Sequence, residues 1–460
     1  MNKNTTTSTE NLYHLNGKIS VKQAIPFGLQ HILAMFVANI APIFIVAAAS
    51  GLSTADSASL IQSAMLIAGI GTLIQLFPIF KIGSGLPIVM GISFTFVSVF
   101  CYLGPTYGYN AIVGAVLVGG IIEGILGLLA KYWIRLITPI VAATVVTAIG
   151  FSLLSVGAAS FGGGSGSETF GSATNWILGT FTLLCCILFN IFAKSYFKQL
   201  SVLFGLIMGH CEPSQIAVNA IKNLCAENNI DFSQLEGTSI IAFPQLLPFK
   251  PEFNINAIIS VPLIFLVSAT ETIGDTSALA AAGLNREATL KETSGSIACD
   301  GFISALSSVF GCLPITSFSQ NVGLVAMTKV VNRYAIGAGA VIMILAGIFP
   351  FFGSLLATLP DAVLGGCTLM MFGNIVISGL QMIGKCGFSQ RNITIAALSL
   401  SIGIGFTQVP EIFDIFPQIV KTVFAENCVA VVFLVAILLN LVLPKNMEAA
   451  PAASDESADA

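Results

Sequence analysis

The sequence has 460 residues, of which 55% are hydrophobic and 9% are charged, and its formal net charge is −4. A soluble globular domain carries about a quarter charged residues, so this composition excludes an ordinary soluble domain and predicts a chain that uses lipid as its solvent. No basic block occurs in the sequence, which excludes nucleic acid as an expected partner.

In chain order, the sequence predicts a series of apolar segments between two polar ends. Residues 1–23 are polar and carry no cleavable signal, so we expect a cytoplasmic tail. Residues 445–460 are acidic and rich in Ala, so we expect a disordered cytoplasmic tail. The fourteen apolar segments between them lie near 25–49, 57–79, 86–103, 109–130, 134–158, 175–193, 199–212, 254–283, 295–311, 313–328, 333–357, 360–383, 390–409 and 425–443.

The third and tenth segments, 86–103 and 313–328, differ from the others. Both are short and are broken by Pro, Gly and polar residues. A continuous helix that faces lipid needs about 20 apolar residues, and irregular backbone is tolerated in a membrane only inside the protein. We therefore expect these two segments to be irregular and to lie in the protein interior.

The positive charges test the number of spans. If the N-terminus is placed in the cytoplasm, 15 of the 18 Lys and Arg fall in segments on the cytoplasmic side, and only Lys222, Lys250 and Lys421 fall on the other side. Cytoplasmic loops carry the excess of Lys and Arg in membrane proteins, and a wrong span count would scramble this alternation. The charges thus favour fourteen spans with both termini in the cytoplasm.

Short repeated stretches divide the chain into two halves. Leu86-Pro87-Ile88 recurs as Leu313-Pro314-Ile315, at an offset of 227 (313 − 86), and a looser echo of Pro139 occurs at Pro360. The loop 213–253 separates the halves. Because each half has seven spans, an odd number, the second copy must be inverted in the membrane. Inverted repeats with paired broken segments are typical of secondary transporters, whose site lies where those segments meet.

Ionisable residues inside a membrane are rare and usually functional. The apolar segments contain His31, Glu123, Glu271, Asp275 and Asp300. Glu271 and Asp275 are four residues apart and share one helix face, and two such close carboxylates cannot both ionise cheaply in a low dielectric. At least one of them is expected to hold a proton, which suits proton-coupled transport. A hydrogen-bonded pair with only a structural role is the alternative.

Gln320 lies in the second broken segment and is a candidate for recognising a planar ring. Its amide offers one acceptor and two donors, which can pair with a ring edge that presents a C=O beside an N–H. The carboxylate of Glu271 can accept ring N–H groups, and Phe94 and Phe318 can cover the ring faces. A structural hydrogen bond is the alternative role for Gln320.

The other polar groups are interpreted more simply. His31 follows Gln30, and a lone His is more often a hydrogen-bonding residue than a proton relay, although coupling stays open. We expect Glu123 to brace transmembrane helices and Asp361 to begin a helix near the membrane interface. No catalytic triad, phosphate loop or metal motif is found, so we expect no enzymatic activity, no cofactor and no bound metal.

The ten cysteines show no C-x-x-C pair and no zinc spacing. We expect them to serve as small packing residues. A disulfide between Cys211 and Cys225, which bracket the start of one loop, is the alternative for that pair.

Several of these motifs together resemble a known family. Gln320-Asn321-x-Gly323-x-x-x-x-Thr328-Lys329 resembles the signature of the nucleobase–ascorbate transporters, also called nucleobase:cation symporter family 2. Gln30-His31, Glu271-Thr272-Ile273-Gly274-Asp275 and Cys299-Asp300-Gly301 are similar to its other markers. The resemblance covers roughly residues 22–443.

The resemblance implies an all-α integral membrane protein with fourteen transmembrane segments in a seven-plus-seven inverted repeat. Its broken spans 3 and 10 meet as short antiparallel strands. Spans 1–4 and 8–11 form a core domain, here 24–133 and 254–358, and spans 5–7 and 12–14 form a gate domain, here 134–253 and 359–444. Members are similar in being homodimers that move the core against the gate like an elevator.

The resemblance also implies roles for individual residues. Glu271 and Gln320 bind the base, and the residues that complete the binding site are Ser93, Phe94, Phe318 and Ser319. The residues that support the site or couple it to the ion are His31, Glu123, Asp275, Asp300 and Asn321.

Residues that differ between branches of this family indicate which class of substrate the chain resembles most. Ascorbate relatives carry Pro where this chain has Gln320, and uracil relatives tend to carry His where it has Asp275. The chain therefore resembles the xanthine and uric acid permeases, which implies H⁺-coupled oxopurine uptake across the cell membrane, with Na⁺ left open. Ser93 departs from the amide or Thr of some xanthine-selective members, so xanthine and urate stay open.

Three alternatives remain. One is a uracil permease of the same fold. Another is an anion exchanger or channel of the related fold, in which cations should line the pathway, whereas Glu271, Asp275 and Asp300 are acidic. The third, a membrane-embedded enzyme, lacks a nucleophile–base or metal set in the sequence.

Overall fold

The computed structural model describes residues 9–164, 166–193, 198, 200–210, 241–357, 359–425 and 427–444. The Cys211–Cys225 pair, most of the loop 213–253 and the tail 445–460 lie outside these described residues. So do the first eight residues of the expected N-terminal tail.

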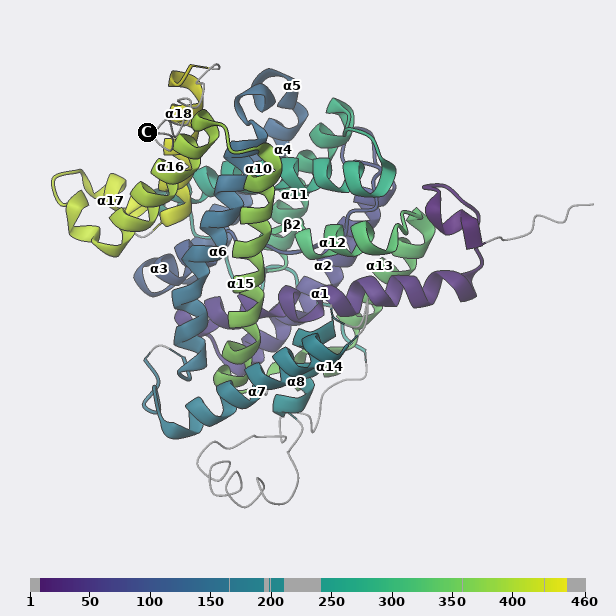
Figure 1. Ribbon diagram of the computed structural model, residues 1–460. Coiled ribbons are helices and arrows are strands. Elements are labelled where there is room, and N and C mark those ends of the chain that lie inside the picture. The colour runs from purple at the N-terminus through teal and green to yellow at the C-terminus, as the bar shows by residue number, and fades with distance from the viewer. Residues whose placement is uncertain are drawn as a thin grey trace, which may run out of the picture.

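The described chain is built from helices and one small sheet (Figure 1). In the first half the elements are η1 Thr9–Tyr13, α1 Val21–Ala49, α2 Thr54–Leu76, β1 Met90–Ile92, α3 Val97–Tyr107, α4 Tyr109–Leu128, α5 Ala130–Trp133, η2 Ile134–Leu136, α6 Pro139–Phe161, α7 Ala173–Phe192 and α8 Ser201–His210. In the second half they are α10 Ile255–Leu284, α11 Leu290–Val309, β2 Ile315–Ser317, α12 Ser319–Thr328, α13 Arg333–Ile348, α14 Pro350–Ala357, α15 Asp361–Cys386, α16 Gln390–Gln408, η5 Pro410–Phe413, α17 Gln418–Phe424 and α18 Cys428–Val442.

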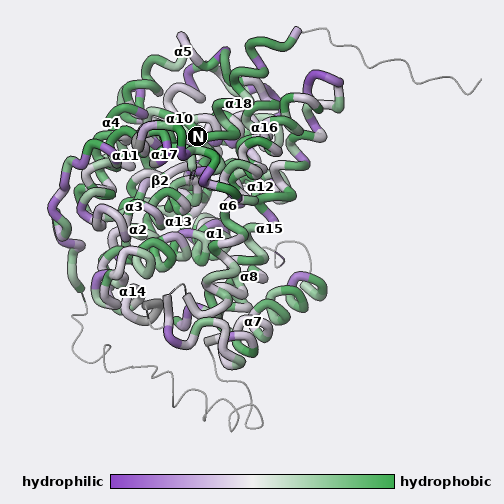
Figure 2. Tube along the Cα trace, turned by 90° about the vertical axis from the view of Figure 1, so that its left-hand side faces the viewer, coloured by the Kyte–Doolittle hydropathy of each residue, from purple (hydrophilic) through white to green (hydrophobic). Residues whose placement is uncertain are grey.

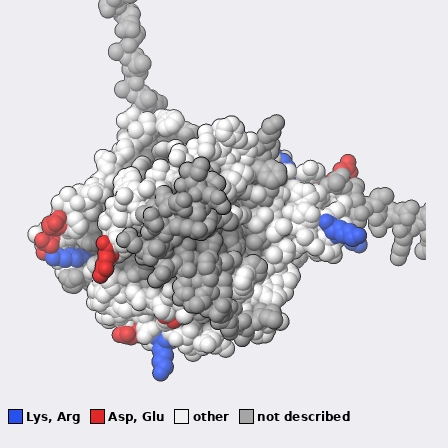
Figure 3. All heavy atoms as spheres, turned by 90° about the horizontal axis from the view of Figure 1, so that it is seen from below, with Lys and Arg blue, Asp and Glu red and all other residues white. Residues whose placement is uncertain are grey.

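The helices follow the fourteen apolar segments expected from the sequence. Among the described residues, seven helices are long and apolar enough to cross a membrane: α1, α2, α4, α6, α7, α10 and α15. Hydrophobic residues dominate most of the helical path, and hydrophilic residues gather toward connections (Figure 2). Charged side chains are few on the face shown in Figure 3, where most of the described surface is uncharged.

Prolines set two of the helix boundaries. The expected segment 333–357 is divided into α13 and α14 at Phe349–Pro350, because Pro lacks a backbone N–H and disfavours helical conformation in the residue before it. α6 begins with Pro139 at its first position, where the missing N–H has no helical partner to lose. Asp361 begins α15, as the sequence predicted.

The two broken segments pair with each other. β1 and β2 are antiparallel, with Met90 opposite Ser317, Gly91 opposite Thr316 and Ile92 opposite Ile315. All six residues are buried, and each strand leads into a short helix, α3 or α12. The prediction that these segments are irregular and internal is confirmed, as is their meeting as antiparallel strands.

The helices form two bundles. The first contains both strands and α1, α2, α3, α4, α10, α11, α12, α13 and α14. The second contains α6, α7, α8, α15, α16 and α18, with α15 packed along α6 (Figure 1). They meet where α10 contacts α6 and α18, and where α1 contacts α8 and α15.

Part of the expected N-terminal tail is packed against the first bundle. Leu12 is 3% exposed, and its carbonyl accepts hydrogen bonds from the backbone of Val331 and Asn332. The Asn332 side chain in turn donates to the carbonyls of Asn11, His14 and Gly17. From η1 onward, therefore, the N-terminal segment is fixed to the connection between α12 and α13.

Candidate functional site

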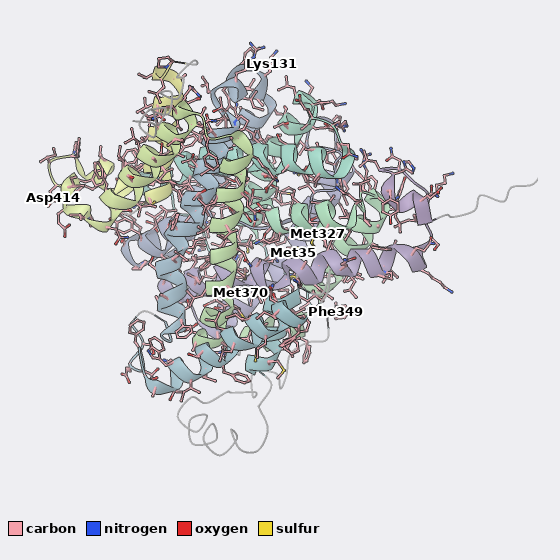
Figure 4. All side chains as sticks on the ribbon, in the orientation of Figure 1. Met35, Lys131, Met327, Phe349, Met370 and Asp414 are labelled. Atoms are coloured by element: carbon pink, nitrogen blue, oxygen red, sulfur yellow. The ribbon has the colours of Figure 1, made fainter. Side chains whose placement is uncertain are left out.

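A cavity of about 410 Å³ lies between the two bundles. One wall comes from α1, α10, α12 and the residues at β1 and β2, and the other comes from α6, α7, α8 and α15. This volume lies within the range of small-molecule sites, about 300–1,000 Å³. In Figure 4, Met35 of α1 and Met327 of α12 lie toward the middle of the molecule, whereas Lys131 and Asp414 lie at its edges.

All six residues expected to bind substrate line this cavity, and the five expected to support the site do not. The lining residues are Ser93, Phe94, Glu271, Phe318, Ser319 and Gln320. The others, which lie behind the wall, are His31, Glu123, Asp275, Asp300 and Asn321. The structure thus brings the first set together around one space, while their roles stay predictions.

The paired strands explain this convergence. Ser93 and Phe94 follow β1, and Phe318 and Ser319 follow β2. Each strand has only three residues, about 10 Å of chain, so the residues at its two ends remain close. α12 begins at Ser319, and the first N–H groups of a helix lack helical partners and can face a polar ligand.

Glu271 is half-buried in α10 and faces the cavity. The Thr95 hydroxyl donates to its Oε2 at 2.7 Å, and this is its one hydrogen bond among the described residues. Neither of the two ion pairs in the described structure involves Glu271. Its second carboxylate oxygen is therefore available to a ligand.

Gln320 is half-buried at the start of α12 and also lines the cavity. No hydrogen bond joins its amide to any other residue that the structure describes. The amide faces the cavity with both its acceptor and its donors free among the described residues, so this side chain is suited to pair with a polar ligand there.

Two phenylalanines supply apolar surface to the cavity. Phe94 packs edge-on against Phe372 of α15, with ring centroids 5.5 Å apart. Phe318 lies against Gly91 of β1, where an added Cβ would meet its ring at 2.5 Å. Glycine at position 91 therefore allows this ring to lie directly on the strand.

Hydroxyl groups of β2 and α12 hold Asp275 behind the cavity wall. Ser319 donates to its Oδ1 at 2.7 Å and Ser317 donates to its Oδ2 at 3.1 Å. Both serines also line the cavity, so the two residues that hold Asp275 lie between it and the space for a ligand.

Asp300 in α11 is fully buried and accepts four hydrogen bonds. Thr272 and Thr316 donate to its Oδ2 at 2.5 and 3.0 Å, and the Ser317 backbone N–H donates to the same oxygen at 3.2 Å. Gln75 donates to its Oδ1 at 3.1 Å. Asp300 therefore ties α2, α10, α11 and β2 together.

His31 and Asn321 are partners. The Asn321 amide lies 3.0 Å from His31 Nδ1 and donates to the His31 carbonyl at 3.0 Å. Both residues are buried, so this pair joins α1 to α12 at the start of the signature motif. Glu123, by contrast, is fully buried in α4 and neither of its carboxylate oxygens has a hydrogen-bond partner among the described residues.

The second bundle contributes a polar wall that the sequence analysis did not identify. Its polar lining residues are Asn190, Lys198, Ser201, Asn374, Ser378 and Gln381. Asn374, Ser378 and Gln381 recur at helical spacing on α15, a pattern of polar residues in an apolar helix that was visible in the sequence. Lys198, one of the positive residues that the charge distribution places on the cytoplasmic side, also lines this wall.

Comparison with known proteins identifies the family. Residues 22–412 match the profile of a family described as "Permease family". The chain belongs to the nucleobase–ascorbate transporter family. Its members are transporters, which agrees with the expectation of a transporter rather than an enzyme.

Relatives in this family align over nearly the whole chain. The chain is 33% identical over 448 residues to the xanthine permease XanQ of Escherichia coli strain K12. This alignment covers 94% of each of the two chains. The chain is 33% identical over 394 residues to the uric acid permease PucK of Bacillus subtilis strain 168, which covers 85% of this chain and 89% of that one.

Solved structures show the same fold at low identity. The transmembrane domain of the cyanobacterial bicarbonate transporter BicA matches 92% of this chain and 97% of its own length, with a TM-score of 0.55 and 14% identity. The murine anion transporter Slc26a9 in its inward-facing state matches 92% of this chain and 69% of its own, with a TM-score of 0.57. This nucleobase–ascorbate transporter therefore has the seven-plus-seven inverted-repeat fold.

Proposed function

We propose that this permease imports an oxopurine nucleobase, xanthine or uric acid, together with a proton across the cell membrane. The observation that carries the proposal is the cavity, where the Glu271 carboxylate and the unpaired Gln320 amide face one space flanked by Phe94 and Phe318.

The chemistry of an oxopurine fits these groups. Its ring N–H groups can donate to Glu271, which among the described residues has one hydrogen bond from Thr95 and none from a cation. A ring C=O beside an N–H can pair with the acceptor and donors of the Gln320 amide. The two phenylalanines offer apolar surface to the planar ring.

The polar wall on α15 extends this recognition to a second ring edge. Asn374 and Gln381 supply amides and Ser378 supplies a hydroxyl on the side of the cavity opposite to Glu271. A purine with carbonyl groups on both of its rings can be held from both sides, whereas a single pyrimidine ring offers fewer groups. The named activities of XanQ and PucK favour an oxopurine over uracil.

The acidic residues support proton coupling and argue against anion exchange. Glu271, Asp275 and Asp300 form one cluster around β2 and α10, and grouped buried carboxylates take up protons readily. The bicarbonate and anion transporters share the fold at 14% identity, which carries no information on substrate. A proton, rather than Na⁺, is therefore the proposed coupling ion.

The position of the cavity supports an elevator-type movement. The proposed core domain, 24–133 and 254–358, carries Glu271 and Gln320, and the proposed gate domain, 134–253 and 359–444, carries the opposite wall. Moving one bundle against the other would then expose the site to either side. We further propose a homodimer in the plasma membrane with both termini in the cytoplasm, in line with the Lys and Arg distribution.

Uptake of radiolabelled xanthine tests the substrate assignment. Cells without their own purine permeases are made to express the protein, and urate, hypoxanthine, guanine and uracil are added as competitors. We expect urate and other oxopurines to compete strongly and uracil weakly. Competition by uracil alone, or no uptake by a well-expressed protein, would overturn the assignment.

A single variant tests the role of Gln320. Gln320→Glu replaces the amide donors with a second acceptor, so the order in which purines compete should change while expression is retained. An unchanged competition order would show that Gln320 does not contact the ring.

A further inference from the structure

Side chains complete the hydrogen bonding of the small sheet beside the cavity. Among the described residues the sheet has two strands, so alternate backbone N–H groups point away from the partner strand. All six strand residues are buried, and buried N–H groups need acceptors. The N–H of Met90 is accepted by Thr72 at 3.0 Å, that of Ile92 by Asn39 at 2.8 Å, that of Ile315 by Ser304 at 3.0 Å and that of Ser317 by Asp300 at 3.2 Å.

Asn39 is the one of these four acceptors that comes from a helix of the cavity wall. It lies on α1, whose residues Ala34 and Ala38 line the cavity. The other three acceptors lie on α2 and α11, and no described residue of these two helices lines the cavity. Asn39 therefore connects the sheet to an element that borders the space for the substrate.

The Asn39 amide is fixed at both ends. Its Oδ1 accepts the Ile92 N–H, and its Nδ2 donates to Met65 Sδ of α2 at 3.4 Å. Asn39 is 0% exposed, and a Cβ on Gly91 would meet its Oδ1 at 2.8 Å. A buried amide in an apolar helix is costly unless it is hydrogen-bonded, so its direct packing on the backbone of β1 indicates that it holds the strand.

The end of β1 that Asn39 holds is the end that leads into the site. Ile92 lines the cavity, whereas Met90 at the other end of the strand does not. The chain continues into Phe94, which lines the cavity, and Thr95, which donates to Glu271 at 2.7 Å. Hydrogen bonds between the strands fix β1 to β2, and the Asn39 hydrogen bond fixes β1 to α1.

We propose that Asn39 is a positioning residue of the substrate site. Through the Ile92 N–H it holds Phe94 and Thr95 where they serve the base, and it thereby sets the affinity for the base. The inference rests on the proposed function, because it assigns a residue that tunes the binding of the same oxopurine. Asn39 does not line the cavity, so it acts through β1 and not by touching the ring.

The test is concentration-dependent uptake of xanthine by cells that express the full-length protein. Asn39→Leu keeps the size of the side chain and removes the acceptor, so the Ile92 N–H loses its partner and β1 shifts. We expect the xanthine concentration at half-maximal uptake to rise about tenfold, while the maximal rate at equal expression changes little, as for a loss of binding alone. Asn39→Asp should return this concentration close to the parent value, because a carboxyl group presents an oxygen at the same place.

Thr72→Val is the matched control. Thr72 is also 0% exposed and accepts the N–H of Met90, at the end of β1 that does not line the cavity. Val has nearly the same shape but no acceptor, so this variant should melt at a lower temperature in detergent, as Asn39→Leu should. Its half-maximal concentration for xanthine should stay near that of the parent.

Asn39→Gln carries the test if Asn39→Leu does not reach the membrane. It keeps an amide but lengthens the side chain by one CH₂ where the amide oxygen already lies against β1. The half-maximal concentration should again rise several-fold, whereas an amide that serves only as a buried polar group would leave it unchanged.

The results separate this inference from the proposed function. A parent-like half-maximal concentration for Asn39→Leu, or for Asn39→Gln in its place, would overturn the role of Asn39 and leave the proposed function standing. An equal rise in Asn39→Leu and Thr72→Val would also overturn it, since the effect would then come from general loosening of β1. A parent that takes up no xanthine would overturn the proposed function and this inference together.

Discussion

At the scale of single residues, hydroxyl groups organise the acidic side of the cavity. Thr95 holds Glu271, Ser317 and Ser319 hold Asp275, and Thr316 holds Asp300. None of these hydroxyls carries charge, so they hold the acids without neutralising them as a cation would. The hydroxyls fix the direction of each carboxylate and leave one oxygen of Glu271 for the ligand.

Thr95→Val should weaken substrate binding. A hydrogen bond to a charged group contributes about 1.5–3 kcal/mol, and its loss frees Glu271 to rotate away from the ring. We expect the xanthine concentration at half-maximal uptake to rise about tenfold, whereas Thr95→Ser should stay near the parent value. The check is concentration-dependent uptake at equal expression, and equal values for the Val and Ser variants would show that the hydroxyl is dispensable.

Sequence reasoning found the acids and amides of the site but not the hydroxyls that hold them. Glu271 and Gln320 stand out because such groups are rare in apolar segments. Thr95 and Thr316 do not stand out, since Thr is common both on strands and inside transmembrane helices. Thr95 is also 176 residues away from its partner Glu271 in the chain, so only the fold brings these two together.

At the scale of elements, close backbone packing between α4 and α11 supports the first bundle. A Cβ on Gly301 would meet the carbonyl of Gly120 at 2.7 Å as well as the backbone of Gly124. Because backbone atoms cannot turn aside as side chains do, glycine is required at position 301.

Gly301→Ala should therefore destabilise the protein. Overpacking of this kind costs about 1–3 kcal/mol, so the variant should melt at a lower temperature in detergent and reach the membrane in smaller amounts. Gly405→Ala is the matched control, because a Cβ there meets nothing within 4 Å and Ala favours the helix. A melting curve for Gly301→Ala that equals the parent's would show that α4 and α11 can move apart without loss of stability.

The start of α11 is fixed by a charged cap. Arg286 donates to Glu292 at 2.9 Å, and the Thr289 backbone N–H donates to it at 2.8 Å. Partial burial raises the pKa of Glu292, but the hydrogen bonds from Arg286 and Thr289 outweigh it and lower the pKa to about 2. Glu292 lies ahead of the apolar segment 295–311 and is partly exposed to water.

This cap predicts a pH-dependent stability difference. A carboxyl whose pKa is lowered on folding stabilises the folded state fully above its unfolded pKa, about 4.3, and loses this effect as the pH falls toward 2. The melting temperatures of the parent and Glu292→Gln in detergent should differ at pH 7 and converge progressively as the pH falls from about 4.5 toward 2. A difference that stays constant over that range would show that the cap does not depend on the charge.

Much of the element order could be predicted from hydropathy, while some boundaries could not. Fourteen apolar segments correspond to helices or strand–helix units because a bilayer demands long apolar stretches. The break at Pro350 was missed because the flanking residues are as apolar as the rest of the segment. The pairing of β1 with β2 came from family resemblance, since three-residue strands have no periodicity of their own.

At the scale of the whole molecule, the cavity lies between two bundles that transport requires to move. Gly274 of α10 and Ala142 of α6 face each other across this boundary, with the Cβ atoms of residues at these positions 3.9 Å apart. This separation lies within the range for a disulfide, about 3.5–4.5 Å.

The double variant Gly274→Cys, Ala142→Cys should lock the bundles together. Oxidation should stop xanthine uptake and a reducing agent should restore it, because the crosslink prevents one bundle from moving past the other. The two single variants are the controls for oxidation of the native cysteines. Full uptake by a fully crosslinked double variant would contradict movement at this boundary.

The central claim, that Glu271 binds an oxopurine taken up with a proton, is tested most directly by accumulation of labelled xanthine in cells that lack their own purine permeases. The parent should concentrate xanthine above the external level, and a protonophore should abolish this accumulation. Glu271→Gln should show neither accumulation nor sensitivity to the protonophore at equal expression. Accumulation by Glu271→Gln at the parent's level, or accumulation by the parent that survives the protonophore, would contradict the account.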